Sequence, residues 1–199
     1  MIPSEVTVIV DKREKTPLLF PEYIEVQLDR TGRTQQVAIK QKVEVMPAGD
    51  YCLEEYDHLC VFETKRSLRE LYNNTCTKDW TREARALKRL SESCAYPHLV
   101  FELSPSELFQ KSIHVPDPEL VFDRWMQVVA RFNLRLMIVG GARQPRQRRT
   151  LGEQLIRLSL AYEQNKPYDA RLWSDEFREK MWEWAPTWIT EGDESCPTN

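Results

Sequence analysis

Residues 6–10 read Val6-Thr7-Val8-Ile9-Val10, and this run does more than any other to decide the fold. All five side chains are β-branched and four are apolar. A nearly continuous apolar run of this kind is typical of a strand buried on both faces in the middle of a sheet. The run ends abruptly at the charged residues 11–14, and strand ends are where the functional sites of α/β proteins collect.

The segments that follow predict an α/β fold. Residues 23–29 and 36–44 alternate between apolar and polar side chains around the turn signal at residues 30–33, which predicts a β-hairpin. Further along, the apolar pattern predicts strands at 51–55, 58–65, 98–103 and 134–140, and helices near 67–72, 80–90, 118–132 and 145–164. We therefore expect a mixed sheet covered by helices on both faces.

Length and composition narrow the class of protein. A chain of 199 residues suits one domain, and no apolar run approaches the length of a membrane helix, so we expect no membrane partner. The five cysteines include no Cys-x-x-Cys pair and the three histidines are far apart, which argues against structural zinc. We expect reduced thiols, an intracellular (cytoplasmic) protein and a catalytic metal, if any, held by oxygen ligands.

Charge is distributed unevenly along the chain. The net charge is -3, but residues 175–199 carry seven acidic and two basic residues. We expect a domain at 1–168 followed by a Trp-rich acidic extension at 169–199, in which residues 173–188 form a helix that packs on the domain or on a partner. Residues 143–149 hold four arginines, which favours either a phosphate-binding patch or a solvated helix start.

Acidic residues recur where strands end. Because strand side chains alternate, Glu63 and Lys65 project from the same face. Taken alone, this pair is typical of a half-exposed strand face. If Asp50 lies at a neighbouring strand end, however, two carboxylates converge and would repel unless a divalent cation lay between them. The three residues together therefore predict a magnesium site beside a lysine that can stabilise developing charge.

Three segments resemble, in order and spacing, the nuclease domain of the XPF-type structure-specific endonucleases, a branch of the PD-(D/E)xK superfamily. They are Val10 to Pro17, Pro47 to Tyr51 and Val61 to Lys65. The resemblance covers about residues 6–160. In this region the chain is similar to small stand-alone members of the family from phages and bacteria. It implies a restriction-endonuclease-like α/β fold, a central mixed sheet flanked by helices with an N-terminal β-hairpin insertion. It also implies a metal-dependent DNA endonuclease for flap, fork or branched DNA in repair, recombination or phage DNA processing.

The resemblance also assigns roles to individual residues. Asp50, Glu63 and Lys65 would be catalytic, and Mg²⁺ or Mn²⁺ would be held by the acids at Asp11, Glu14, Asp50 and Glu63. The chain departs from the usual motif at Thr64, where the family has arginine, and the acid expected on the next helix is shifted to Glu70. Arg13 and Arg66 are the candidates to replace the missing arginine.

The chain lacks the glycine-containing turns of the helix-hairpin-helix repeats that bind DNA in larger XPF-type proteins. We expect DNA contacts instead from basic residues on the domain itself, namely Arg13, Arg66, Arg82, Arg85, Lys88, Arg89, Arg143, Arg146, Arg148 and Arg149. Two alternatives stay open. One is a non-catalytic DNA-binding or scaffold subunit that pairs with an active nuclease. The other is an interaction protein that binds a second copy or another protein through residues 169–199.

Overall fold

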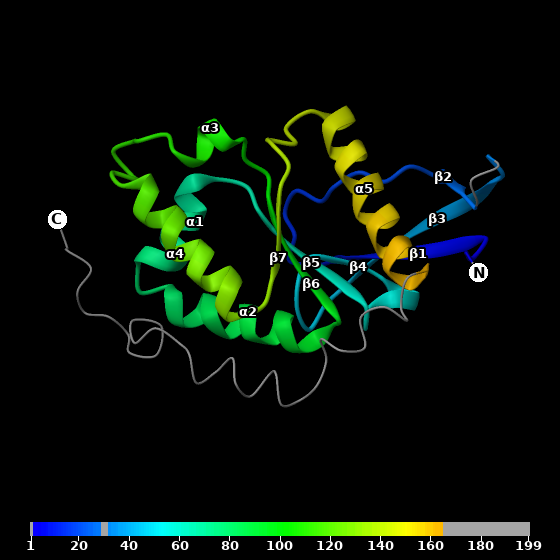
Figure 1. Cartoon of the computed structure of the whole chain (residues 1–199), viewed down its shortest axis with the longest axis horizontal. Helices are drawn as coiled ribbons and strands as arrows, with labels where there is room; N and C mark the ends of the chain where they lie inside the picture. The colour runs from blue at the N-terminus through cyan, green and yellow to red at the C-terminus, as the bar shows by residue number, and fades with distance from the viewer. Residues whose placement is uncertain (1, 29–31, 165–199) are drawn as a thin grey trace.

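The structure is a computed structural model that describes residues 2–28 and 32–164. Its framework is a seven-stranded sheet in the order β2-β3-β1-β4-β5-β6-β7 (Figure 1). The strands are β1 (Glu5–Asp11), β2 (Tyr23–Gln27), β3 (Thr34–Glu44), β4 (Tyr51–Leu53), β5 (Cys60–Lys65), β6 (Tyr96–Phe101) and β7 (Arg135–Ile138). The helix expected at 173–188, the extension at 169–199 and part of the turn at 30–33 lie outside the described residues.

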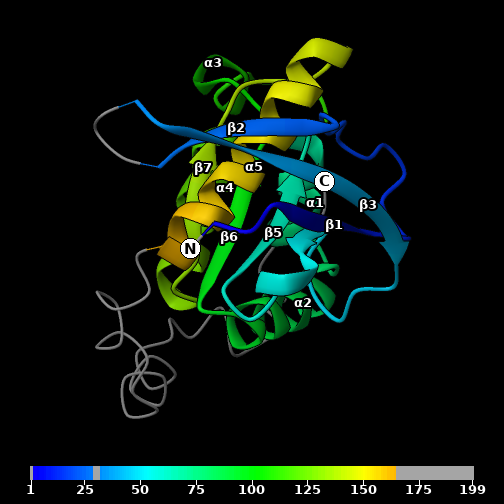
Figure 2. The ribbon, with the colours of Figure 1, turned by 90° about the vertical axis from the view of Figure 1, so that its right-hand side faces the viewer.

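The apolar run at residues 6–10 forms β1, as expected, in the interior of the sheet. Val6, Val8 and Val10 are buried on one face, and Ile9 is buried on the other. The hairpin β2–β3 is confirmed and extends the sheet, because β3 pairs with β1 in parallel from Ala38 to Glu44. Figure 2 shows the long, curved β3 beside β1 with β2 on its outer side.

The direction of the strands decides where the site lies. β1, β3, β5, β6 and β7 run the same way, whereas β2 and β4 are antiparallel to their neighbours. The C-terminal ends of these five strands therefore meet at one edge of the sheet, the C-terminal edge. Side chains that follow β1 and β5 lie close together there although about 50 residues separate them in the sequence.

Helices cover both faces, as expected. On one face lie α1 (Leu68–Cys76), α2 (Trp80–Ser93) and α4 (Pro118–Arg131), and on the other lies α5 (Pro145–Gln164) (Figure 1). The fully buried Trp125 of α4 packs edge-on against Phe101 of β6 at 5.5 Å between ring centroids. On the α5 side, Leu155 and Ile156 are buried with the valines of β1. Each face of the sheet therefore has its own apolar core.

The structure corrects several predicted boundaries. The strand predicted at 51–55 ends at Leu53 and continues as the 3₁₀ helix η1 (Glu54–Tyr56), after which the Leu59 N–H donates to the Tyr56 carbonyl at 2.9 Å and closes a turn. The strands predicted at 58–65 and 134–140 are shorter. The one-turn helix α3 (Pro105–Leu108) was not predicted, although Ser104 and Glu107 form the capping box that marks such a start.

The structure bears on the expected state of the cysteines and on the search for membrane helices. The four described cysteines are buried free thiols, at residues 52, 60, 76 and 94. Within residues 2–28 and 32–164, no helix has both the length and the apolar character needed to cross a membrane.

Candidate active site

The end of β5 carries the predicted carboxylate and lysine side by side. Val61, Glu63 and Lys65 share the face that α1 and α2 cover, as the alternation of strand side chains requires. Lys65 Nζ lies 2.7 Å from Glu63 Oε1, and the lysine side chain is only 5% exposed. A lysine so deeply buried must be paired to remain charged, and Glu63 supplies the first partner.

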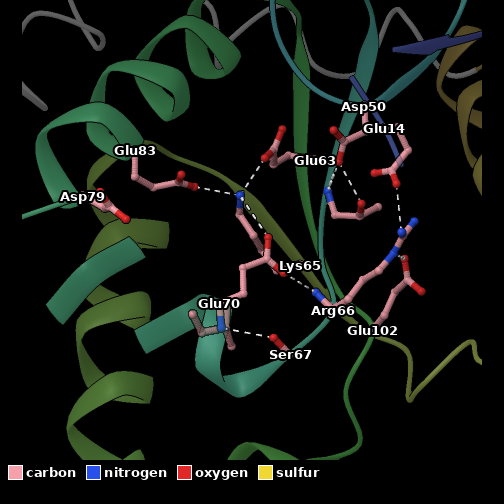
Figure 3. A network of polar contacts seen from close by, with 12 residues as sticks. Glu14, Asp50, Glu63, Lys65, Arg66, Ser67, Glu70, Asp79, Glu83 and Glu102 are labelled. Carbon is pink, nitrogen blue, oxygen red and sulfur yellow. Dashed lines mark hydrogen bonds and ion pairs between the residues drawn. The ribbon is translucent and has the colours of Figure 1, made fainter. Parts of the chain in front are cut away.

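Two helices bring further carboxylates to the same ammonium group (Figure 3). Glu83, in the first turn of α2, places Oε1 2.9 Å from Lys65 Nζ. Glu70, in the first turn of α1, places Oε1 at 4.0 Å. The Ser67 hydroxyl caps α1 by accepting the Glu70 N–H, which fixes that turn beside the lysine.

Charge and burial have opposite effects on Lys65 and Glu83. Burial lowers the pKa of Lys65, but the carboxylates of Glu63, Glu83 and Glu70 outweigh burial and raise it, so the lysine stays protonated. Burial raises the pKa of Glu83, and the nearby Lys65 only partly offsets this increase. Lys65 is therefore a fixed positive charge, not a proton acceptor.

Asp50 joins the cluster through a close approach of two chain segments. Gly49, at φ +71°, passes so near β5 that a Cβ atom there would lie 2.3 Å from Val61 Cγ1. The Asp50 N–H then donates to the Phe62 carbonyl at 2.7 Å. Both the amide and the hydroxyl of Thr64 donate to Asp50 Oδ2, at 2.7 and 2.8 Å.

The two acids of this site repel each other. Burial and the neighbouring charge of Glu63 raise the pKa of Asp50 to about 7, despite the hydrogen bonds from Thr64. Among the described residues, none donates a hydrogen bond to Asp50 Oδ1 or to Glu63 Oε2. Each acid thus has one uncommitted oxygen, and ionising both is costly without a cation.

This arrangement suits Mg²⁺ or Mn²⁺, which prefer carboxylate oxygens. Residues 2–28 and 32–164 contain no group of three or more His, Cys, Asp or Glu side chains placed to hold a metal ion. Two carboxylates are nevertheless sufficient for Mg²⁺, which typically keeps several waters and takes further oxygens from substrate phosphates. The donor set of Asp50 and Glu63 therefore fits the implied ion.

The structure places the other two predicted metal ligands with arginines. Both Asp11 oxygens accept hydrogen bonds from Arg13, and Asp11 is only 2% exposed. Glu14 Oε1 lies 2.9 Å from Arg66 Nη1, and Arg66 Nε in turn lies 3.0 Å from Glu102 Oε1 (Figure 3). The four predicted acids thus have four different partners, namely Arg13, Arg66, Thr64 and Lys65.

The predicted DNA-contacting arginines form two groups at the C-terminal edge. Arg82 and Arg85 are exposed at the start of α2, and Arg146 and Arg149 are exposed at the start of α5. Arg143 pairs with Glu107 at 2.5 Å but remains 78% exposed. Arg148 differs, because its guanidinium donates to the carbonyls of Thr16 and Pro17 and so fastens α5 to the loop after β1.

The sequence reasoning missed two acids. Glu83 lies on the buried face of α2 with Trp80, Leu87 and Leu90. The helical spacing places this acid at a core position, which could have marked it as part of a site. Glu102 directly follows the buried strand β6 and is 4% exposed. Its position after an apolar run is the same signal that singled out the acids after β1.

No protein-family model matches the sequence, and no curated protein sequence is significantly similar to it. The solved structures that match include XPF from Aeropyrum pernix, with a TM-score of 0.50, and XPF from Aeropyrum pernix in complex with DNA, also with a TM-score of 0.50. Identity is 18% over 77% of this chain and 61% of the first structure, and 22% over 86% of this chain and 69% of the second.

The chain has an XPF-type fold. The resemblance inferred from the three sequence motifs is thereby confirmed at the level of fold, as is the mixed sheet with flanking helices. The XPF-like region corresponds to less than two thirds of the first matched structure.

The raised pKa of Asp50 predicts how Asp50→Asn changes stability with pH. Because the folded-state pKa of about 7 lies above the ordinary value of 3.8, ionisation lowers the free energy of unfolding as pH rises from about 4 to about 7. In EDTA, Asp50→Asn is expected to unfold at a higher temperature than the wild type at pH 8, with little difference at pH 4.

Asp11→Asn is the matched control for this measurement. Burial raises the pKa of Asp11, but the hydrogen bonds from Arg13 and Met46 outweigh burial and lower it. The charged form therefore stabilises the fold at pH 8, and this variant is expected to lower the unfolding temperature there. If Asp50→Asn raised the unfolding temperature by the same amount at pH 4 and at pH 8, the repulsion between Asp50 and Glu63 would be contradicted.

Removal of the lysine charge is predicted to destabilise the fold. Lys65→Met leaves Glu63 and Glu83 buried without their counter-ion, so the free energy of unfolding is expected to fall by about 3–5 kcal/mol in urea denaturation. The double variant Lys65→Met/Glu83→Gln should recover part of this loss. Lys88→Met removes an exposed lysine that pairs with Glu92 at 3.8 Å, and it should cost less than about 1 kcal/mol. Equal effects of Lys65→Met and Lys88→Met would disprove the buried ion cluster.

Proposed function

We propose that this chain is a Mg²⁺- or Mn²⁺-dependent DNA endonuclease that hydrolyses phosphodiester bonds. The observation that carries the proposal is the half-buried carboxylate pair, Asp50 and Glu63, beside the buried, protonated Lys65 at the C-terminal edge. One of the matched XPF structures is a complex with DNA. We further propose an intracellular enzyme that cuts flap, fork or branched DNA during repair, recombination or phage DNA processing.

Asp50 and Glu63 would hold the cation through the oxygens that Thr64 and Lys65 leave uncommitted. When bound there, such an ion polarises a phosphoryl oxygen and acidifies a coordinated water. Thr64 contributes by fixing the orientation of the Asp50 carboxylate with two hydrogen bonds. This hydroxyl occupies the position at which the XPF-type motif has arginine.

Lys65 would stabilise the negative charge that develops on the phosphate. Its ammonium group donates to Glu63 Oε1 at 2.7 Å and forms an ion pair with Glu83 Oε1 at 2.9 Å, whereas Glu70 Oε1 lies 4.0 Å away. A preoriented ammonium in a water-poor site stabilises such charge without reorganisation. Since the lysine stays protonated, it does not accept a proton from the attacking water.

Two groups of arginines support a DNA partner. Arg82 and Arg85 lie near the start of α2 on one face of the sheet. Arg146 and Arg149 lie near the start of α5 on the other face. Both helices begin near the edge that carries Asp50 and Glu63, because Glu83 of α2 contacts Lys65 and Arg148 of α5 contacts the loop after β1. Phosphate contacts with these arginines would therefore hold DNA at this edge. These contacts would supply affinity that falls with salt.

A second candidate function is a non-catalytic DNA-binding or scaffold subunit of the same fold. Thr64 favours it, because no guanidinium occupies that position of the motif. The complete set of acids around Lys65 favours the enzyme.

The proposed activity can be tested by cleavage of end-labelled flap, fork, linear duplex and single-stranded DNA in Mg²⁺, Mn²⁺ or EDTA. We expect cutting only with metal and a loss of at least about 100-fold in Asp50→Asn, because one of two metal ligands is removed. The matched control is Asp57→Asn, which changes an acid whose side chain is 69% exposed and which should keep full activity.

Because Asp50→Asn is expected to be more stable than the wild type at pH 8, its inactivity would not reflect unfolding. Full activity of Asp50→Asn would refute the assigned site. DNA binding without cutting in either metal would instead support the scaffold subunit.

A further inference from the structure

Asp11 is the most completely occupied carboxylate of the site region. Its Oδ1 accepts the Arg13 backbone N–H at 2.6 Å and Arg13 Nε at 2.8 Å. Its Oδ2 accepts Arg13 Nη2 at 2.7 Å and the Met46 N–H at 2.9 Å. An ionised carboxylate offers about four lone-pair positions, so four hydrogen bonds leave none for a metal ion.

Arg13 is held at one end and open at the other. Nε and Nη2 bind Asp11, and Nη2 also donates to the Met46 carbonyl at 2.8 Å. Neither N–H of Nη1 has a partner among the described residues, and the side chain is 64% exposed. The result is a rigid guanidinium that presents two unused donors to solvent.

Arg13 lies at the same edge of the sheet as the carboxylate pair. The Asp11 N–H donates to the Asp50 carbonyl at 2.8 Å, which joins the end of β1 to the start of β4. The charges of Asp50 and Glu63 also contribute to the raised pKa of Arg13, after the larger effect of its hydrogen bond to Asp11. Arg13 and the two acids therefore lie at the same edge of the sheet, close enough for their charges to interact.

Arg66, the other candidate for the missing arginine, is placed differently. Its Nη1 and Nε pair with Glu14 and Glu102, and its side chain is 26% exposed. One guanidinium between two acids leaves no excess positive charge to attract a phosphate. Arg66 ties β5 to β6 and to the loop after β1, which is a structural role.

We infer that Arg13 binds a non-bridging phosphate oxygen of the DNA next to Asp50 and Glu63, and that Asp11 is the positioning residue that orients Arg13. Asp11 is then not a ligand of the metal ion. A guanidinium matches phosphate geometry, and one already fixed by a carboxylate loses little side-chain entropy when it binds. This inference rests on the proposed function. Arg13, after β1, would make the phosphate contact that Thr64 cannot make.

The test measures DNA binding and metal binding separately in the full chain. Fork DNA is titrated in EDTA, where no cutting occurs, at several salt concentrations. Arg13→Gln should bind about tenfold more weakly and reduce the slope of log affinity against log salt by about one. Arg13→Lys keeps the positive charge but loses the planar guanidinium, so we expect a loss of DNA affinity smaller than that of Arg13→Gln. Arg157→Gln is the matched control, because Arg157 is bound to Glu153 and the Glu25 carbonyl at the opposite edge.

Metal binding is read from the rise in unfolding temperature on addition of MnCl₂. Asp11→Asn should keep the wild-type rise, whereas Asp50→Asn should lose it. In DNA binding, Asp11→Asn should be several-fold weaker than the wild type, and the double variant Asp11→Asn/Arg13→Gln no weaker than Arg13→Gln alone, because one residue acts through the other. If Asp11→Asn does not fold, the two Arg13 variants still decide the phosphate contact.

The outcomes separate this inference from the proposed function. Loss of the Mn²⁺-induced rise in Asp11→Asn, or unchanged DNA affinity in Arg13→Gln, overturns the inference alone. A wild-type chain that binds no DNA, or whose unfolding temperature does not respond to Mn²⁺, overturns the proposed function and the inference with it.

Discussion

At the C-terminal end of β5, the carboxylates of Asp50, Glu63, Glu70 and Glu83 lie around the single ammonium group of Lys65. One positive charge cannot balance four acids. Burial, followed by repulsion from the neighbouring Glu63, raises the pKa of Asp50 to about 7. A divalent cation relieves this repulsion better than protonation does at neutral pH. The repulsion in the site therefore lowers the free energy of unfolding until a cation or a proton binds.

The surrounding arginines confine this excess charge to one place. Asp11 is paired with Arg13, and Arg66 is shared by Glu14 and Glu102, so these acids add less to the repulsion between Asp50 and Glu63 than unpaired acids would. The contacts of Arg66 also join the segment after β1 to the ends of β5 and β6. Charge pairing that stabilises the edge of the sheet thus also defines which two acids are left for a metal ion.

Much of this arrangement could be predicted from the sequence, and the reasons are local. The β-branched run at residues 6–10 specifies a central strand, and the alternation of strand side chains places Glu63 beside Lys65. Glu83 was not predicted, because its contact with Lys65 depends on how α2 packs against the sheet. The pairing of Asp11 with Arg13 depends on the turn after β1, where the Glu14 N–H bonds to the Asp11 carbonyl. Sequence spacing does not specify such a turn, so it could not separate a metal ligand from a positioning residue.

The most direct test of the carboxylate pair is a crystal structure of the full chain soaked in MnCl₂, with anomalous diffraction used to locate the ion. We expect one strong peak about 2.0–2.2 Å from oxygens of both Asp50 and Glu63, with Asp11 still bonded to Arg13. A peak bound by Asp11 or Glu14, or the absence of any peak between Asp50 and Glu63, would contradict this expectation.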